Sequence, residues 1–495
     1  MFLFAFLAVP AGLWRPALAH GAALLGTASA WLAAVGGLWT VLQQGPIPYM
    51  LGGWPRPLGI EYRLDGLSAL LTTLVTGFGF IVVVYGRRQV DRQQGRLAAY
   101  YYALLLLFLA GLSGIVLTAD VFNLFVFLEI SSLSSYALIA CGGRRGLMAA
   151  FRYLVLGTIA GSLYLLGIGF WLFETGTLNM AHLAELLPSL YGERSVALGL
   201  GLIVTGLSIK MALFPLHLWL PDAYAYAPPT FSPLIAAIGT KVSAYALMRL
   251  LFWVAGPAYT MGQLPVGHWL LGLGAAGIVI GSALAVPQRN LRRLLAMSSV
   301  GQVGYIAAGL GLGSPLGLVA AVLHIVNHAV AKACMFLAAG SIHAKLGTDR
   351  LSALSGIASG LPWTSAAAVV AGFSLIGVPP LGGFFSKWVL VQAAVEAGAW
   401  WLVAAIIVGS LIAVGYVFRV IRQLYRGPVV AAASPAATDR SELRAPVMAG
   451  GDNLREAPPA MLVPTVALAL LTVVLGLGNA YLVVYILQHA LPPGL

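Results

Sequence analysis

Four lysines lie inside apolar stretches of a chain that has only five lysines in 495 residues. A charge at mid-bilayer costs about 2.5–3.5 kcal/mol on insertion scales, so such positions indicate function. A buried lysine, unlike an arginine, can lose its proton, because desolvation favours its neutral form. Such side chains could form a proton relay; the alternative, lysine stems that snorkel to the interface, suits helix ends only. The four are Lys210, Lys241, Lys332 and Lys387.

Other titratable residues extend this pattern. Glu129 lies within the apolar stretch 121–141, where its charge could pair with a buried lysine. His324, His328 and Lys332 follow at i, i+4 and i+8, so they share one face of a helix. Because histidine titrates near neutral pH, this stripe could shuttle protons. Polar residues that merely pack helices together are the alternative.

A metal site is a further alternative for the histidine pair, because two histidines at i, i+4 can bind zinc. No glutamate follows His324 as in H-E-x-x-H, and no further ligand lies nearby in the sequence. Cys141 and Cys334 have neither metal nor disulfide spacing. Nucleotide, iron–sulfur and haem motifs are also missing from the sequence. We therefore expect no metal and no cofactor.

The composition shows which elements must position these residues. The chain is 60% hydrophobic and 8% charged, whereas soluble proteins carry about 25% charged residues. So few charges cannot cover a water-facing surface, which excludes a soluble enzyme and a nucleic-acid binder. The sequence predicts an all-α polytopic membrane protein with about 14 transmembrane helices, since a span needs about 20 apolar residues. The apolar segments are 1–20, 22–43, 65–86, 98–118, 121–141, 148–173, 196–218, 230–255, 267–287, 291–311, 315–340, 362–393, 399–424 and 460–488.

Two of these segments are interrupted by proline, which removes a backbone donor and clashes with the preceding turn. Broken helices at membrane depth need protein or water around their freed backbone groups. One break in each half indicates an internal repeat with a transport site between the halves. Harmless kinks are the alternative, but Lys210 and Lys387 lie beside the breaks. The predicted helix breaks are at Pro215, Pro221, Pro379 and Pro380.

Several polar residues near these sites give weaker signals. His217 and Asp222 flank the first break and could line an access path or cap a helix. Ser131, Ser134 and Tyr136 lie near Glu129 in sequence and are candidate hydrogen-bond partners.

The positions of the arginines predict the orientation, because basic residues concentrate in short cytoplasmic loops. The loops at 87–97, 142–147, 288–293, 341–361 and 419–459 hold most arginines, and the last of them contains the long polar loop 427–459. We therefore expect these loops in the cytoplasm and, with an even number of helices, both termini on the outer side of the cell inner (plasma) membrane. The first apolar run could be a signal peptide, but no basic residue precedes it, which favours a membrane span.

Longer stretches around these residues resemble a known family, the antiporter-like membrane subunits shared by Mrp-type cation/proton antiporters, respiratory complex I and membrane-bound hydrogenases. The most specific stretch is IKMALFPLHLWLPDAYAYAPPTFSPLIAAIGTKVSAYALMRL at 209–250. Also similar are VFNLFVFLEISSLSSYAL at 121–138, HIVNHAVAKACMFLAAGS at 324–341 and IGVPPLGGFFSKWVLVQAA at 376–394. Lys387 together with the histidine stripe looks most like the D subunits of Mrp antiporters.

The resemblance implies a proton relay in the middle of the membrane, in which Glu129 pairs with Lys210 and Lys387 leads toward the outer side. Its members are Glu129, Lys210, Lys241, His324, His328, Lys332 and Lys387. The resemblance also implies two inverted five-helix repeats, each with a broken helix. The corresponding divisions are helices 1–3 in 1–97, a first repeat in 98–255, a second repeat in 256–426, the loop 427–459 and a last helix in 460–495.

Three functions fit these observations. The first is a proton-translocating subunit of a multi-subunit monovalent cation (Na⁺)/proton antiporter, with other membrane subunits, protons and Na⁺ as partners. The second is a pumping subunit of a redox complex, either NADH-quinone oxidoreductase or a membrane-bound hydrogenase; in neither would this chain carry catalytic chemistry of its own. The third, a self-sufficient transporter of a small solute, is disfavoured because no solute motif is present.

Overall fold

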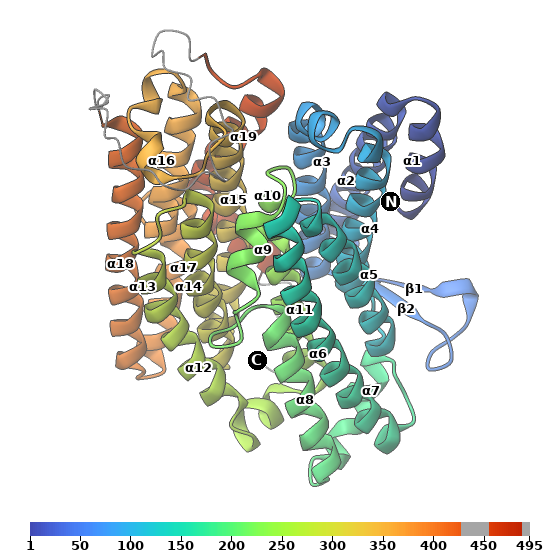
Figure 1. The fold of residues 1–495 in the computed structure, drawn as a ribbon. Helices are drawn as coiled ribbons and strands as arrows, with labels where there is room; N and C mark the ends of the chain where they lie inside the picture. The colour runs from blue at the N-terminus through green and yellow to red at the C-terminus, as the bar shows by residue number, and fades with distance from the viewer. Residues whose placement is uncertain (427–454, 488–495) are drawn as a thin grey trace.

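The computed structural model describes residues 1–426 and 455–487 and is mostly helical. Long helices run side by side in one bundle, and a β-hairpin projects from its side (Figure 1). Eleven helices of the described residues are long and apolar enough to cross a membrane. The predicted fold class, an all-α polytopic membrane protein, is confirmed, while the count of fourteen and the inverted repeats stay predictions.

The N-terminal region holds three long or medium helices and the hairpin. Its elements are α1 (Phe2–Trp14), α2 (Pro16–Gln44), β1 (Ile47–Met50), the 3₁₀ turn η1 (Leu51–Gly53), β2 (Glu61–Leu64), α3 (Gly66–Gln94) and η2 (Gly95–Leu97). The hairpin, which the sequence did not predict, is antiparallel and pairs Ile47 with Leu64 and Met50 with Glu61.

The next region contains the first broken helix. Its elements are α4 (Ala98–Leu117), α5 (Val121–Ala140), α6 (Gly143–Thr175), α7 (Met180–Leu186), η3 (Leu187–Leu190), α8 (Arg194–Lys210), α9 (Leu220–Tyr226), α10 (Ser232–Leu234), the π-helical η4 (Ile235–Gly239), α11 (Thr240–Arg249) and the π-helical η5 (Leu250–Val254). From α10 to η5 the backbone forms one apolar span with two π-helical segments.

The second half contains the other broken helix. Its elements are η6 (Ala258–Gln263), α12 (Val266–Ala276), η7 (Gly277–Gly281), α13 (Ser282–Ala285), α14 (Leu291–Gly311), α15 (Pro315–Leu346), η8 (Leu351–Leu354), η9 (Ile357–Ser359), α16 (Pro362–Ile376), α17 (Gly382–Glu396) and α18 (Trp400–Tyr425). The C-terminal elements are α19 (Pro459–Leu477), α20 (Asn479–Tyr481) and η10 (Leu482–Leu487). The predicted loop at 427–459 lies outside the described residues as far as 454.

Helix starts are fixed by short polar side chains, as expected for N-caps. The Asp120 carboxylate accepts from the Asn123 amide at the start of α5, and Asn290 accepts from the Arg293 amide at the start of α14. Ser314 caps α15, with Pro315 in its first turn. These caps set the register of the three helices that carry Glu129, Ser298 and the histidines.

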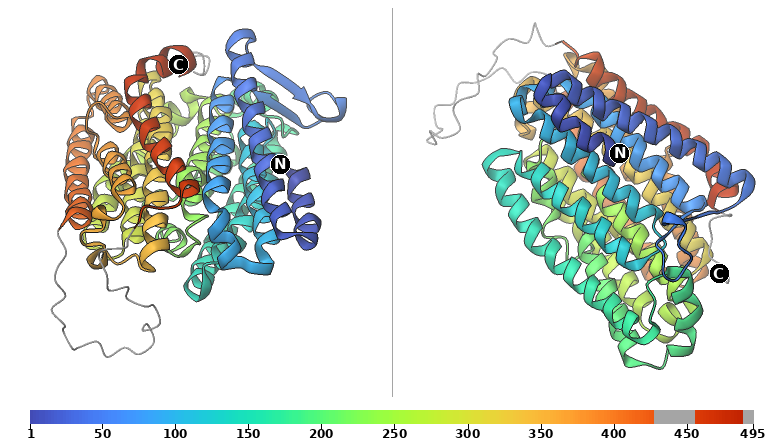
Figure 2. Two further views of the ribbon diagram at one scale, coloured as in Figure 1. Left: turned by 90° about the horizontal axis from the view of Figure 1, so that it is seen from above. Right: turned by 90° about the vertical axis from the view of Figure 1, so that its right-hand side faces the viewer.

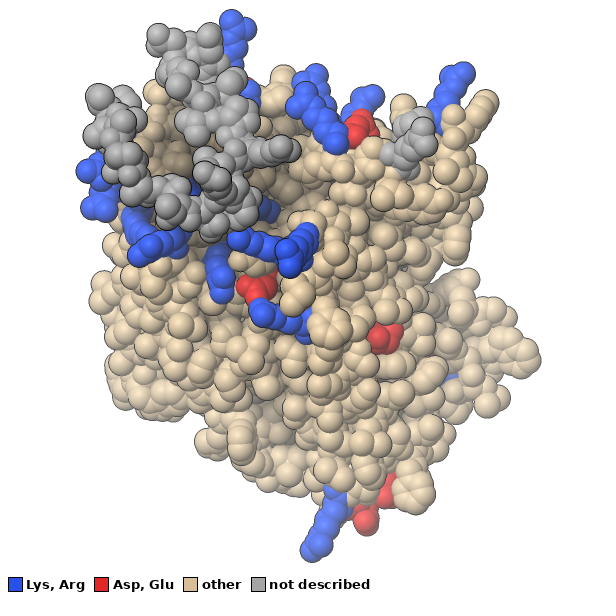
Figure 3. All heavy atoms as spheres, in the orientation of Figure 1, with Lys and Arg blue, Asp and Glu red and all other residues tan. Residues whose placement is uncertain are grey.

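The central helix is α15, which is buried without interruption from Gly317 to Ile342. It packs against α14, α16, α17 and α19, and against η4 of the first half. The red helix α19 in Figure 2 lies beside α15 and α16 and also contacts α3, so it joins the second half to the N-terminal region. Lysines and arginines gather at one end of the molecule, the upper end in Figure 3.

Candidate functional site: a file of buried lysines and histidines

The first helix break places Lys210 beside Glu129. Lys210 is the last residue of α8, and its side chain is only 4% exposed. Its Nζ lies 3.4 Å from Oε1 of Glu129 and donates to Oγ of Ser132 at 2.6 Å. Glu129 is half-buried on α5, so this ion pair links a buried lysine to a carboxylate near the protein surface.

Ser132 therefore supplies the hydroxyl at this site, in place of the neighbours expected from the sequence. The hydroxyls of Ser131 and Ser134 donate to carbonyls of their own helix, and the Tyr136 hydroxyl has no hydrogen-bond partner among the described residues. Gly161 on α6 makes room for the carboxylate, because a Cβ at this position would lie 2.6 Å from Oε1 of Glu129. A larger residue at 161 would displace the carboxylate from Lys210.

The break itself runs from Met211 to Trp219. Pro215 lies within this unwound segment, and Ala212 has φ = 59°, the only positive φ of a non-glycine among the described residues. The carbonyl of Ile209 accepts from the Ala212 amide at 3.0 Å and from the Trp219 indole at 2.8 Å, so the far side of the break is bonded to the end of α8. Pro221 lies in the first turn of α9, a position that tolerates proline, so it begins the helix after the break.

The candidate access residues lie at different depths. His217 is buried within the break, where its ring stacks on Phe214 with centroids 5.4 Å apart. Asp222 on α9 accepts from Nη1 of Arg152 at 2.6 Å and lies 3.7 Å from Nη2 of Arg293. Asp222 therefore lies at the arginine-rich end of the bundle, and no hydrogen bond among the described residues joins it directly to His217.

Lys241 lies on α11, directly after the π-helical segment η4. Its Nζ donates to the carbonyl of Ala236 inside that segment. The side chain is buried and forms no ion pair with any described residue. The lysine therefore bonds to the backbone of the π-helical segment that precedes it.

The histidine stripe on α15 runs through the centre of the bundle. The rings of His324 and His328 stack with centroids 5.7 Å apart, and Nδ1 of His324 lies 3.0 Å from Oγ of Ser386 on α17. Further along α15, Lys332 donates to the carbonyl of Leu295 at 2.7 Å and to Oγ of Ser298, both on α14. The stripe therefore reaches α17 at one end and α14 at the other.

The row of residues from Glu129 and Lys210 through Lys241, His324, His328 and Lys332, here called the file, ends at Lys387 on α17, beside the second break. Its Nζ donates to the carbonyls of Leu375 and Ile376, each at 2.9 Å, at the broken end of α16. It also donates to Oγ of Ser410 at 3.2 Å and lies 4.7 Å from the ring centroid of Tyr305. The break that frees these carbonyls lies between α16 and α17 and contains Pro379 and Pro380.

Asn327 is a site residue that sequence reasoning missed. It lies between the two histidines on α15, and its Nδ2 donates to the carbonyl of Gly382 at 2.8 Å. A Cβ at Gly382 would lie 2.4 Å from Oδ1 of Asn327, so this contact requires glycine. Asn327 therefore fixes the start of α17 against the stripe; its position between two predicted relay residues was the signal that could have found it.

The predicted members fall into two groups. One group is a buried cluster around α15: the Tyr305 ring lies 5.0 Å from the His324 ring and 4.7 Å from Nζ of Lys387, and the rings of His324 and His328 are 5.7 Å apart. Lys332 follows on α15, and Lys241 of the first half follows η4, which packs against α15. The Glu129–Lys210 pair stands apart: α8 packs against α11, but no hydrogen bond or ion pair among the described residues joins the pair to Lys241.

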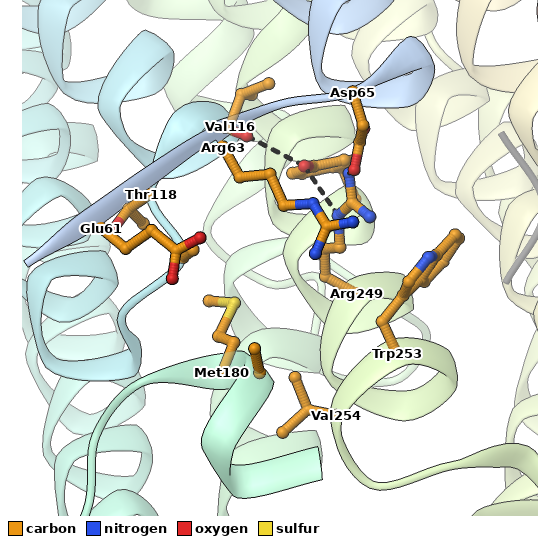
Figure 4. A pocket seen from close by; sticks show the side chains of 12 residues that line it. Glu61, Arg63, Asp65, Val116, Thr118, Met180, Arg249, Trp253 and Val254 are labelled. Atoms are coloured by element: carbon orange, nitrogen blue, oxygen red, sulfur yellow. Dashed lines mark hydrogen bonds and ion pairs between the residues drawn. The ribbon is translucent and has the colours of Figure 1, made fainter. Parts of the chain in front are cut away.

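A second ionic site lies at the opposite end of α11, in a small cavity of ≈ 80 Å³. Figure 4 shows Asp65 and Arg249 facing each other there, with Arg63 extending across the cavity and Glu61 on its far side. Nη2 of Arg249 lies 2.5 Å from each oxygen of Asp65. Burial raises the pKa of the Asp65 carboxyl, but the charge and hydrogen bond of Arg249 hold this pKa below its usual value. The pair ties α3 to α11.

A third ionic cluster ties the arginine-rich end together. Arg292 on α14 donates through Nη2 to Oδ2 of Asp349 at 2.6 Å and through Nη1 to the carbonyl of Ala227 at 2.9 Å. His343 on α15 lies 3.1 Å from Oδ1 of Asp349. Burial raises the pKa of the Asp349 carboxyl, but the hydrogen bond of His343 and the charge of Arg292 together hold this pKa below its usual value.

Known proteins share both this sequence pattern and this fold. The family described as NADH:quinone oxidoreductase/Mrp antiporter, TM, matches residues 118–413. NADH-quinone oxidoreductase subunit N of Desulforudis audaxviator is 48% identical over 92% of this chain and 89% of its own. The D subunit of the Na(+)/H(+) antiporter of Alkalihalophilus pseudofirmus is 34% identical over 72% of this chain and 71% of its own.

Solved structures of related complexes contain chains with the same fold. A chain of the Mrp complex from Dietzia sp. matches with a TM-score of 0.87 and 27% identity, over 99% of this chain and 95% of its own. A chain of an archaeal membrane-bound sulfane sulfur reductase, a respiratory complex, matches with a TM-score of 0.87 and 30% identity, over 99% and 94%. These relatives are parts of antiporter-type or respiratory membrane complexes. The chain belongs to the NADH:quinone oxidoreductase/Mrp antiporter family of polytopic membrane subunits.

Proposed function

We propose that this chain moves protons within the membrane plane, along the file that runs from Glu129 to Lys387, as one subunit of a multi-subunit monovalent cation (Na⁺)/proton antiporter. The observation that carries the proposal is the buried cluster of three lysines and two histidines drawn from both halves of the bundle. Charges at such depth are costly and mark ion or proton pathways in membrane proteins.

The donors and acceptors around the file support a chain of water between the side chains. Several buried polar atoms along it have no hydrogen-bond partner among the described residues: Nδ1 of His217, Oγ1 of Thr240, Nε2 of His324, Oδ1 of Asn327 and both ring nitrogens of His328. A buried polar atom costs free energy unless it is hydrogen-bonded, and water bridges such atoms where the site is polar. We therefore infer a hydrated polar axis near mid-depth through both halves.

The division into repeats belongs to the same proposal. In each of the segments 98–255 and 256–426 a broken helix carries a lysine at or just beyond the break, Lys210 in one and Lys387 in the other. Such an arrangement is expected of inverted repeats with a transport path between them. His217 and Asp222 would form the access path to the first break from the arginine-rich side.

The complex with this chain should be purified through a tag on the chain and reconstituted into vesicles that carry a pH-sensitive dye. Addition of NaCl should collapse an imposed pH gradient, and the His324→Ala/His328→Ala variant should lose this activity. His268 on α12 is exposed and offers a control, because His268→Ala should transport normally. Wild-type rates in the double variant would contradict the proton path.

A respiratory complex is the second candidate, and the 48% identity to a protein named NADH-quinone oxidoreductase subunit N favours it. The proton path would be the same, but it would be driven by electron transfer. The subunits that co-purify with the tagged chain separate the two candidates: iron–sulfur and flavin subunits would indicate the respiratory complex, and small membrane subunits the antiporter.

The proposed location is the cell inner membrane, with the arginine-rich end in the cytoplasm and both termini outside. Cys141 is exposed at the end of α5, whereas Cys334 is buried, so Cys141 gives a built-in label for this test. In intact spheroplasts a membrane-impermeant maleimide should leave Cys141 unlabelled, and lysis should expose it. Labelling of Cys141 before lysis would show that the orientation is the reverse of the proposed one.

A further inference from the structure

A cavity of ≈ 590 Å³ lies at the end of α18, and none of the lysines or histidines of the file lines it. Three arginines, two serines and a glutamine contribute polar groups to its lining: Arg419, Arg422, Arg426, Ser352, Ser355 and Gln423. Arg419 and Arg422 lie at i and i+3 on the last turns of α18, and Arg426 follows directly after the helix ends, so three positive charges lie together here. No carboxylate of the described residues lines the cavity.

The cavity lies between α18 and the segment of η8 and η9, and hydrogen bonds join these two elements. Gln423 on α18 donates through Nε2 to the carbonyl of Ser352 at 3.4 Å, and its own backbone carbonyl accepts from the Gly356 amide at 3.3 Å. Arg419 donates to the carbonyl of Val286, at the end of the neighbouring span. The segment of η8 and η9 is therefore held beside α18, and the cavity between them is a fixed part of the fold.

The groups inside the cavity favour an anion. Arg422 and Arg426 form no ion pair within residues 1–426 and 455–487, whereas Arg292, Arg249 and Arg152 each do. Oγ of Ser355 is buried and has no partner among the same residues. Arginine forks bind phosphate oxygens in pairs, and a hydroxyl can donate one more hydrogen bond. Stabilisation of the helix C-terminus by basic residues explains their position on α18 but not the cavity that they line.

The surroundings indicate that the anion is part of a lipid. α18 is one of the candidate membrane spans, so its last turn lies at headgroup level. Leu411, Phe418 and Tyr425 follow at seven-residue spacing on α18 and are all exposed, forming an apolar strip beside the arginines. Basic pockets between transmembrane helices bind anionic lipid headgroups on the cytoplasmic side. We propose that this cavity binds the phosphate of an anionic phospholipid, whose acyl chains lie along the apolar strip.

The test compares the complex that contains the wild-type chain with the Arg422→Gln/Arg426→Gln variant in nanodiscs. One set contains phosphatidylglycerol and the other only phosphatidylcholine. The wild-type complex should melt at a higher temperature in phosphatidylglycerol, and native mass spectrometry should show retained phosphatidylglycerol. The variant should retain it about thirtyfold less, since each arginine near an anionic surface contributes roughly 1 kcal/mol. Arg422→Lys/Arg426→Lys keeps both charges and should retain an intermediate amount.

A matched control is Arg87→Gln/Arg88→Gln, which removes two exposed arginines from the end of α3 outside the cavity. This control should retain the lipid like the wild type. If the control loses as much lipid as the glutamine variant, the overall charge explains the loss and the proposed binding site is wrong. Inorganic phosphate alone should not reproduce the thermal shift; if it does, the cavity binds a soluble anion and the lipid assignment is wrong. Equal retention by the glutamine variant and the wild type would also overturn it.

Discussion

Lys210 ends α8 just before the first break, and Lys387 lies in α17 just beyond the second, and their positive charges have different partners. Lys210 has a carboxylate, Glu129, at 3.4 Å and a hydroxyl, Ser132, at 2.6 Å. Lys387 has two backbone carbonyls, the Ser410 hydroxyl and the face of Tyr305. A carboxylate can gain a proton and lose its charge, whereas carbonyl dipoles and an aromatic ring cannot.

In the proposed proton path, this difference gives the two ends of the file separate tasks. At the first break, protonation of Glu129 would remove the charge that stabilises Lys210, so the pair can switch. At the second break the partners of Lys387 carry fixed dipoles rather than a charge that can be neutralised, so proton release there depends on the neighbouring water or residues. In the proposed path, the two ends communicate through the cluster of Lys241 and the histidines.

The largest effect on transport is expected from removing one member of the Glu129–Lys210 ion pair. Glu129→Ala leaves Lys210 buried without its counter-charge, and such changes cost about 3–5 kcal/mol when a buried pair loses one member. Proton transport by the reconstituted complex should fall to background in Glu129→Ala and in Lys210→Ala, while expression stays near normal. Glu185→Ala, which removes an exposed carboxylate from α7, is the control. Wild-type transport in either variant would show that the pair is not part of the path.

The next effect concerns proton exchange at the second break. Lys387→Ala removes a proton carrier and should abolish transport, whereas Lys387→Glu keeps a titratable group and should retain part of it. Dye-based transport assays on matched amounts of complex would measure both. Full activity of Lys387→Ala would give this residue a structural role, since its hydrogen bonds to Leu375 and Ile376 close the end of α16.

A smaller and unequal effect is expected from the two hydroxyls. A hydrogen bond to a charged group contributes about 1.5–3 kcal/mol, and Lys210 has fewer oxygen partners than Lys387. Ser132→Ala should therefore slow transport by about tenfold, the lower end of that range, and Ser410→Ala by about twofold or threefold because the two carbonyls remain. Transport rates of the two variants, measured side by side, test this difference between the two hydroxyls. Equal effects would mean that the two lysines are stabilised alike.

The smallest effect on transport is expected at the arginine-rich end, outside both breaks. Asp349→Asn should lower the stability of the complex by about 3 kcal/mol, because it leaves Arg292 buried without its counter-charge. The pKa of Asp349 is lowered in the fold, so its contribution is present above the ordinary value of 3.8 and is lost as the pH falls below it. Thermal unfolding from pH 8 to pH 3 should show wild type and variant converging at the acid end only. A constant difference at all pH values would contradict this.

The helices themselves could be predicted well, because long apolar runs with polar caps leave few alternatives. The segments predicted at 121–141 and 291–311 correspond to α5 (Val121–Ala140) and α14 (Leu291–Gly311) within a residue. The β-hairpin at 47–64 was missed, since two four-residue strands joined by a proline- and glycine-rich loop have no clear period. The predicted span 362–393 is two helices, and the unwound turn between them depends on Asn327 from a distant segment.

The site was predictable in its titratable members but not in their partners. Costly charges in apolar runs are visible in any sequence, so Glu129 and the four lysines could be named. Which oxygen each lysine contacts depends on helix packing. Ser132 rather than its neighbours faces Lys210, and Lys241 bonds to a carbonyl inside the π-helical segment η4. Backbone carbonyls have no sequence signature at all.

The order of the helices along the chain has a consequence for biogenesis. α15 carries three histidines, an asparagine and two lysines, and it is covered on one side by α19, where the Cys334 thiol contacts the carbonyl of Thr465. The ribosome makes α19 (Pro459–Leu477) more than a hundred residues after α15 has been released. During that interval the side of α15 that α19 covers lacks its final neighbour. Insertion of α19 is therefore the step that closes the bundle, and nascent chains stalled before Pro459 should be the preferred substrates of membrane quality-control proteases.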